Sequence, residues 1–96
     1  MAKFITRIEL YGNPGDEVIK LAHAAMELAK FKNQVVLSGI LYCMPKAEYI
    51  WEGTGTINTI EALAVQAVMP IWKDFGVMTI KTESRIGFVN LKPAEK

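Results

Sequence analysis

The segment from residue 3 to residue 11 alternates between two sets of side chains, one of them more apolar than the other. Because successive side chains of a strand point to opposite faces, this alternation predicts a strand with one buried face. The residues that follow, 12–16, include two glycines and a proline, which should end the strand. The face expected in the core carries Phe4, Thr6, Ile8 and Leu10, and the other carries Ile5, Arg7, Glu9 and Tyr11.

Apolar residues next recur at the spacing of one helix face, which predicts a first helix that continues to about Lys32. Asn13 followed by Pro14 fits an N-cap with proline at the first helical position, because the missing N–H of proline is no loss there. The acidic residues directly after Pro14 suit the positive end of the helix dipole.

Three further segments are predicted as strands. Residues 35–44 are mostly β-branched, aromatic and aliphatic, and they are too few for another helix with its caps. Pro45 has no N–H to donate, so it should mark the turn into a strand over residues 47–52. Alternation returns at residues 77–83, and residues 86–91 form a possible short fifth strand.

A second helix is predicted over residues 59–73, with Asn58 and Glu61 as its capping box and Pro70 loosening its last turn. This helix is apolar over a wider arc than packing on one side of a sheet requires. The extra apolar stripe is therefore a candidate oligomer interface. It consists of Val65, Met69 and Trp72.

Two strand-helix-strand units of this size predict an α+β domain with the order β-α-β-β-α-β, the ferredoxin-like plan. In that plan right-handed crossovers place both helices on one face of a four-stranded antiparallel sheet. The length of 96 residues suits a single domain over residues 1–96, with 92–96 as a frayed tail.

Composition excludes some classes of protein. Of the residues, 51% are hydrophobic and 22% are charged, as in ordinary folded domains, and the formal net charge of +1 provides no overall attraction to nucleic acid or anionic membranes. With a single cysteine and no signal-peptide or membrane-spanning stretch, a cytoplasmic protein that does not bind membranes is expected.

Neither of the two most reactive side chains in the sequence has visible chemical partners. His23 is expected at the surface or boundary of the first helix, and Cys43 as a small hydrophobe within the second strand. The glycine-containing loops match no phosphate-binding motif. We therefore expect no cofactor and no metal site. These observations favour a binding module over an enzyme.

The sheet face left uncovered by the helices is the main candidate binding surface. From the first strand it should carry Arg7, Glu9 and Tyr11, and from the last strand Lys81 or Glu83. The third strand should add either Tyr49 and Trp51 or Glu48 and Glu52, depending on its register. Aromatic and basic residues on an open sheet suit single-stranded nucleic acid, and they also suit a protein interface. The neutral charge balance favours self-association or protein binding over nucleic acid.

Acidic residues leave an enzymatic alternative open. Metal-dependent hydrolysis needs converging carboxylates to hold the ion and orient water, and Glu9 and Glu83 near two strand ends are the weak catalytic candidates. A metal-dependent nuclease or nucleic-acid binder is therefore one alternative function. A pocket for a small ligand, indicated only by the abundance of methionine and aromatic residues, is another.

Three segments together resemble a group of small uncharacterised proteins of bacteria, prophages and mobile elements. They are residues 4–10 (Phe-Ile-Thr-Arg-Ile-Glu-Leu), residues 44–49 (Met-Pro-Lys-Ala-Glu-Tyr), and residues 79–84 (Thr-Ile-Lys-Thr-Glu-Ser) with Gly87. The resemblance implies a ferredoxin-like fold and brings no catalytic residue. The function expected from the sequence is a non-enzymatic interaction module of a phage or mobile element, which acts as a homodimer and has a possible macromolecular partner.

Overall fold

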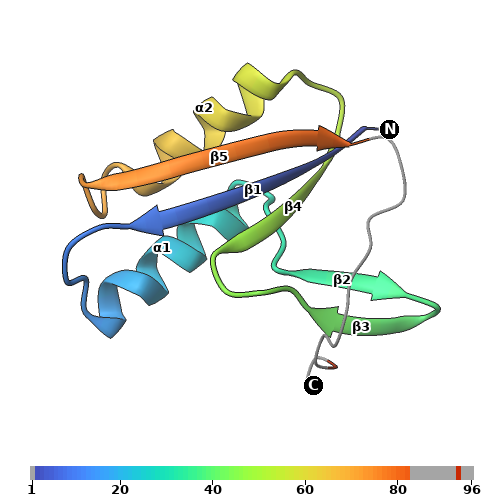
Figure 1. The fold of residues 1–96 in the computed structure, drawn as a ribbon, viewed down its shortest axis with the longest axis horizontal. Helices are drawn as coiled ribbons and strands as arrows, with labels where there is room; N and C mark the ends of the chain where they lie inside the picture. Colours follow the sequence, from blue (N-terminus) through green and yellow to red (C-terminus); the bar gives the residue numbers. More distant parts are fainter. Residues whose placement is uncertain (1, 83–92, 94–96) are drawn as a thin grey trace.

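A computed structural model describes residues 2–82 and Pro93 of the chain. Over these residues the chain forms an α+β domain of two helices and five strands (Figure 1). The predicted class is therefore confirmed. In chain order the elements are β1 (Ala2–Leu10), α1 (Asp16–Leu28), β2 (Gln34–Leu37), β3 (Ile40–Cys43), β4 (Glu48–Gly53), α2 (Ile57–Val68) and β5 (Phe75–Thr82).

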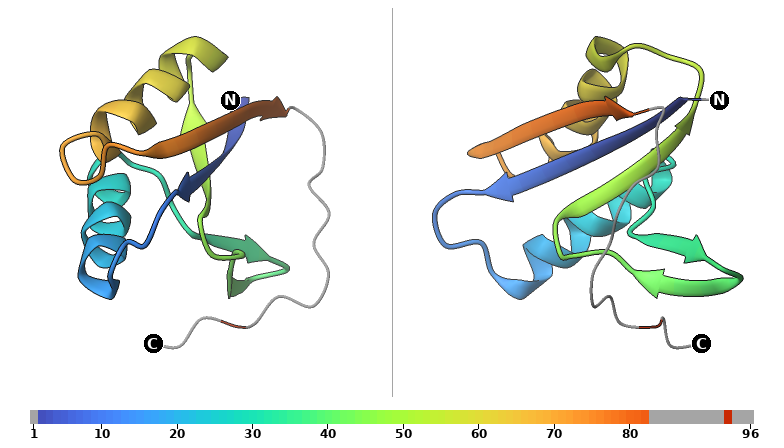
Figure 2. Two further views of the ribbon diagram at one scale, coloured as in Figure 1. Left: turned by 60° about the vertical axis from the view of Figure 1, so that its left-hand side comes forward. Right: turned by 45° about the vertical axis from the view of Figure 1, so that its right-hand side comes forward.

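The main sheet is antiparallel and has the order β4-β1-β5, with β1 at its centre. Both helices lie on one side of it (Figure 2). Phe4, Thr6 and Ile8 of β1 point to that side and are buried, as predicted from the alternation. The opposite side, which we call the open face, carries the other set of β1 side chains.

The predicted four-stranded sheet is wrong. Residues 34–43 form not one strand but the hairpin β2–β3, a two-stranded sheet of its own that stands apart from the main sheet (Figure 2). Ser38 and Gly39 have φ of 52° and 80°, the positive values that a two-residue hairpin turn requires. Only Lys32, just before the hairpin, pairs with the outer edge of β4, through two backbone hydrogen bonds with Ile50 of 2.7 and 2.8 Å.

The helix starts also differ from the prediction. Helix α1 begins at Asp16 after Gly15, without a side-chain cap, so Asn13 is not its N-cap. In α2 the cap is Thr56, whose side-chain oxygen accepts a hydrogen bond of 3.2 Å from the backbone N–H of Thr59, in place of the predicted Asn58 capping box. Each predicted cap was two residues away from the residue that adopts the extended backbone of a cap.

Helix α2 ends at Val68, five residues before the predicted end at residue 73. Pro70 cannot continue the hydrogen-bond ladder, and the chain instead makes a turn in which the N–H groups of Ile71 and Trp72 both bond to the carbonyl of Val68. The possible strand at 86–91 and the tail, except Pro93, lie outside the described residues. Pro93 forms an isolated bridge with Tyr42 of β3.

Helix α1 ends in a Schellman motif. The N–H of Lys30 donates to the carbonyl of Glu27 at 2.9 Å, and the N–H of Phe31 donates to that of Met26 at 3.0 Å. Lys30 has a φ of 72°, a left-handed conformation that costs a non-glycine residue about 1–2 kcal/mol. Phe31 is fully buried as a result, and burial of such a side chain contributes about 1.5–3 kcal/mol, which is enough to hold the turn.

The core lies between the helices and the inner face of the main sheet. Its fully buried polar residue, Thr6, shares a hydrogen bond of 3.0 Å with the hydroxyl of Thr79 on β5. Within the described part of the chain, no buried side-chain nitrogen or oxygen lacks a hydrogen-bond partner. The largest fully buried side chains are Phe4, Phe31, Met26, Ile60, Val68 and Thr6.

The turn before β4 provides a stability test. Its Glu48 N–H donates to the Pro45 carbonyl at 3.1 Å, and Ala47 has a φ of 69°, which glycine adopts without strain. Ala47→Gly should remove this strain and raise the free energy of unfolding in urea titrations by about 0.5–1 kcal/mol. This value allows for the greater freedom of glycine in the unfolded state, which offsets part of the gain. The matched change Ala62→Gly, at an exposed site within α2, should lower it by about 1 kcal/mol. A loss in both variants would contradict the assigned strain.

Candidate functional site

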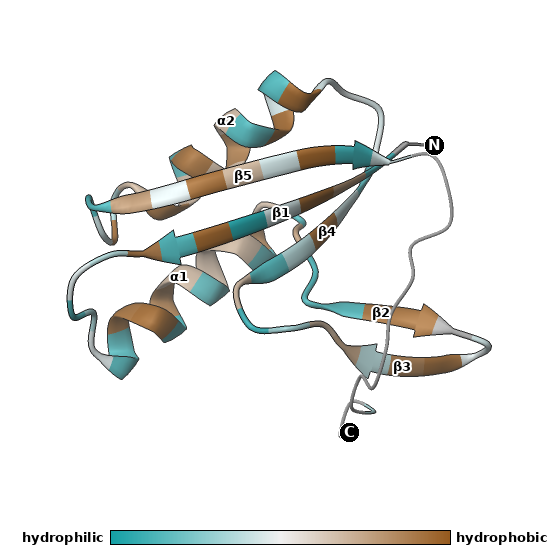
Figure 3. Ribbon diagram, viewed as in Figure 1, coloured by the Kyte–Doolittle hydropathy of each residue, from teal (hydrophilic) through white to brown (hydrophobic). Residues whose placement is uncertain are grey.

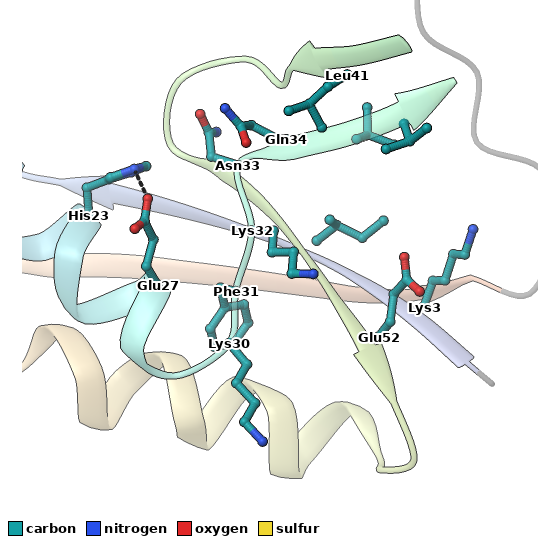
Figure 4. A pocket seen from close by; sticks show the side chains of 13 residues that line it. Lys3, His23, Glu27, Lys30, Phe31, Lys32, Asn33, Gln34, Leu41 and Glu52 are labelled. Atoms are coloured by element: carbon teal, nitrogen blue, oxygen red, sulfur yellow. Dashed lines mark ion pairs between the residues drawn. The ribbon is translucent and has the colours of Figure 1, made fainter. Parts of the chain in front are cut away.

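Three polar side chains from α1 and β4 form a continuous hydrogen-bonded row. His23 and Glu27 are one helical turn apart, so they share a face of α1, and His23 Nε2 lies 2.7 Å from Glu27 Oε1 (Figure 4). The other ring nitrogen, Nδ1, lies 3.0 Å from the hydroxyl oxygen of Tyr49 on β4. We call this row the Glu27–His23–Tyr49 relay.

The positions of the protons in the relay follow from its chemistry. An ionised carboxylate only accepts hydrogen bonds, so Nε2 must carry the proton that is donated to Glu27. In a neutral imidazole Nδ1 is then the acceptor, and the phenol of Tyr49 donates to it. When the ring is doubly protonated, Nδ1–H donates to the Tyr49 oxygen instead. The relay thus responds to protonation of His23 by reversing one hydrogen bond.

Tyr49 is the buried end of the relay. Only 6% of its surface is exposed, and its ring packs edge-on against Phe31 with centroids 6.5 Å apart. Burial, and to a smaller degree the negative charge of Glu27, raises the pKa of Tyr49 above its ordinary value of 10.0. The phenol therefore keeps its proton at neutral pH and does not act as a base.

Two clefts meet at His23. The first, of about 840 Å³, lies between the end of α1, the outer edge of β4 and the β2–β3 hairpin, and we call it the hairpin cleft (Figure 4). The second, of about 700 Å³, lies between α1 and the end of β1, and Ile19, Met26 and Lys46 contribute to its lining. Both volumes are in the range of small-molecule sites. The imidazole of His23 lines both clefts.

The register of β4 decides which of its residues reach the open face. Phe4 pairs with Trp51 and Thr6 with Tyr49, so both aromatic residues lie on the inner face with the core. Trp51 donates from its indole N–H to the Ala29 carbonyl at 3.3 Å. The open face therefore carries Glu48 and Glu52 instead, the second of the two alternatives left by the sequence.

The other predicted surface residues are placed separately. Arg7 and Glu9 are exposed on the open face. Tyr11 lies beyond the end of β1 and is 46% exposed. Lys81 pairs with Phe4 and so belongs to the inner side of β5. Arg7 therefore lies on the opposite face from the two aromatic residues of β4, whereas Lys81 shares the inner side of the main sheet with them.

The three residues of the candidate stripe on the second helix have different surroundings in the structure. Trp72 lies beyond the end of α2, is half-buried, and donates from its indole N–H to the Tyr11 carbonyl at 2.9 Å. It therefore joins the loop before β5 to the end of β1. Val65 is half-buried, and Met69 is the exposed member of the stripe.

The acidic pair proposed for catalysis stays a prediction, because only Glu9 lies within the described residues. Glu83 lies outside them, and no group of three or more His, Cys, Asp or Glu residues that could hold a metal occurs among residues 2–82 and Pro93. The thiol of Cys43 is free and half-buried. None of the helices in the described ranges is long and apolar enough to cross a membrane.

Comparison with protein-family models, with curated proteins and with solved structures finds no significant match to this chain. The functional conclusions below therefore depend on its own geometry.

The relay was missed from the sequence, although part of its signal is local. The His23 and Glu27 spacing of four residues places both on one helix face and is visible in the sequence. Tyr49 is 26 residues from His23, and its position depends on how β4 pairs with β1. Half of the relay could therefore have been found, but not the residue that anchors it in the core.

The raised pKa of Tyr49 predicts a loss of stability at alkaline pH. Because the folded state holds the phenolic proton more tightly than the unfolded state, this contribution is complete below pH 10 and is lost as the pH rises through the folded pKa. In urea titrations between pH 8 and 11, the free energy of unfolding should fall less steeply for Tyr49→Phe than for the unmodified chain. Tyr11→Phe retains Tyr49 and should retain the original slope. Equal slopes for Tyr49→Phe and the unmodified chain would refute the prediction.

Proposed function

We propose that this chain is a non-enzymatic interaction module that forms a homodimer through the outer strand β5. The observation that carries the proposal is the exposure of Met78 and Ile80, at 61% and 52%, on the open face of that strand. Ile5 of β1 lies directly beside Ile80 and extends the apolar row. Figure 3 shows hydrophobic colouring over much of β5.

The position of β5 favours pairing with another strand. It pairs with β1 along one edge, and no strand in the described part of the chain pairs with residues 75–80 along the other. An edge strand presents a row of N–H and C=O groups that another chain can extend. Exposed apolar side chains beside such a row mark it as an interface more than as a solvated edge.

A second copy of the chain complements this edge. In an antiparallel pair of β5 strands centred on Thr79, Met78 of each copy would stand opposite Ile80 of the other. Such a contact is isologous, as the two-fold symmetry of most homodimers requires. The formal net charge of only +1 opposes association weakly, and β5 carries no acidic residue that would be placed next to its own copy.

The interface proposed here differs from the helix stripe predicted from the sequence. Trp72 is already engaged with the Tyr11 carbonyl, and Val65 is half-buried, which leaves Met69 as the exposed part of that stripe. The apolar residues of β5 make a longer continuous row. The nucleic-acid alternative is not favoured, because Tyr49 and Trp51 face the core and provide no stacking surface on the open face.

A ferredoxin-like relationship, as in the prophage and mobile-element proteins that the sequence resembles, is part of the proposal. What supports it is the central β1 between β4 and β5, with both helices on one face, which matches three of the four strands of that plan. In the chain order the β2–β3 hairpin then occupies the place of the second strand of that plan, between α1 and β4. In this view the hairpin replaces one edge strand of the ferredoxin-like sheet.

Light scattering coupled to size-exclusion chromatography tests the dimer. The unmodified chain should have twice the 10.7 kDa mass of one chain, while Met78→Lys/Ile80→Lys should have the mass of one chain. Both sites are exposed, so the far-ultraviolet circular dichroism of the variant should remain unchanged. As the control, Leu28→Lys on α1 changes an 86% exposed leucine and should remain a dimer. A monomer before substitution, or a dimer after it, would refute the proposed interface.

A further inference from the structure

The hairpin cleft combines positive charge with an apolar wall. Lys32 projects its side chain into the cleft, and Lys3 and Lys30 lie toward its two ends (Figure 4). On the hairpin side, Val36 and Leu41 form a cross-strand pair, and both are exposed. Figure 3 colours most of β2 and β3 as hydrophobic. An exposed apolar pair beside lysines suits a ligand that has both an apolar part and a negative charge.

Among the described residues, no carboxylate forms an ion pair with a lysine of this cleft. The ion pair recorded among the described residues is His23–Glu27, so neither Lys30 nor Lys32 has a carboxylate partner there. Of the two glutamates in the lining, Glu27 is held by His23, and Glu52 lies beside Lys3 at one end of the cleft (Figure 4). Around Lys32, in the middle of the cleft, no carboxylate of the described residues therefore balances the lysine charge.

The backbone at Lys30 is a second and independent observation. Its φ of 72° is the conformation in which helices usually place glycine. A lysine there is strained, and strain of this kind collects at functional sites. Lys30 is among the residues that line the cleft, and its ammonium group points away from the hairpin (Figure 4), so its charge acts at the end of the cleft and not at Lys32. A lysine near the end of a helix also complements the helix dipole, so stability and binding must be measured separately.

We propose that the hairpin cleft binds a small organic anion with an apolar chain, whose carboxylate or phosphate group lies at Lys32. The apolar chain packs against Val36 and Leu41, and Lys3 and Lys30 add to the positive potential at the two ends. The cleft volume of about 840 Å³ is sufficient for such a molecule. The site lies on β2, β3 and the outer edge of β4, away from the β5 edge, and does not depend on the homodimer.

Octyl phosphate and octanoate, each below its micelle-forming concentration, are suitable probes for calorimetric titration of the full chain. At least one should bind with one site per chain, while octyltrimethylammonium, with the same apolar chain and the opposite charge, should not bind. Inorganic phosphate should bind at least tenfold more weakly than octyl phosphate. The two anions also distinguish a phosphate ligand from a carboxylate ligand.

Lysine variants test the position of the negative group. Lys32→Gln should weaken binding of the anion about tenfold, while Lys73→Gln, an exposed lysine in the loop before β5, should leave the affinity unchanged. Lys30→Gly should raise the urea midpoint of unfolding and at the same time weaken binding about threefold. A purely structural role for Lys30 would change the midpoint and leave the affinity as it was, which would remove its role in the site.

Amide chemical shifts in nitrogen-15 correlation spectra locate the bound probe. On titration with octyl phosphate, the largest changes should be at Lys32, Val36 and Leu41. Changes centred on Lys46 and Ile19 would place the anion in the second cleft and overturn the proposal. It would also be overturned if neither anion bound at millimolar concentration, if the cationic probe bound equally well, or if Lys32→Gln retained full affinity.

Discussion

Burial of Phe31 beneath the end of α1 is the interaction on which the rest of the structure depends. To place this ring in the core, the chain must reverse within three residues, and it does so through the left-handed backbone of Lys30. The favourable burial of an aromatic side chain outweighs the cost of that turn. The reversal then brings Lys32 against Ile50 of β4. The residues after Lys32 turn away from the main sheet and form the β2–β3 hairpin.

The same reversal creates the surroundings of the relay and the hairpin cleft. Phe31 packs against the ring of Tyr49, and His23 shares a hydrogen bond with the Tyr49 hydroxyl. The relay therefore connects the core to both clefts through one imidazole. The relay has the carboxylate–histidine–hydroxyl order of a site for nucleophilic catalysis. However, the raised pKa of Tyr49 makes its phenol a poor nucleophile at neutral pH. An orienting and binding role fits this chemistry better than covalent catalysis.

The two proposed surfaces use different physical properties of the chain. Along residues 75–80, the β5 edge combines apolar side chains with backbone groups that no other strand of the described chain pairs with, which favours another strand as its partner. The hairpin cleft combines an apolar wall with lysines that have no ion-pair partner in the part of the chain that the structure describes, which favours a small amphipathic anion. Because β1 and β4 separate β5 from the hairpin, each surface can be occupied without blocking the other. A module that dimerises through one side and binds a ligand on the other is consistent with this arrangement.

The sequence by itself determined the features that depend on neighbouring residues. Alternation assigned both faces of β1, and helical spacing located α1 and α2, because these patterns arise within one element. The Ser38–Gly39 turn also depends only on neighbouring residues, so the sequence contained the signal for a hairpin. The prediction of one strand over residues 35–44 overlooked this signal and was wrong. The tertiary structure alone decided that Tyr49 and Trp51 face the core, since a shift of one residue in the pairing of β4 would reverse its faces. It also decided that Tyr49 meets His23, because contacts between distant residues depend on how whole elements pack, and no local pattern records that packing.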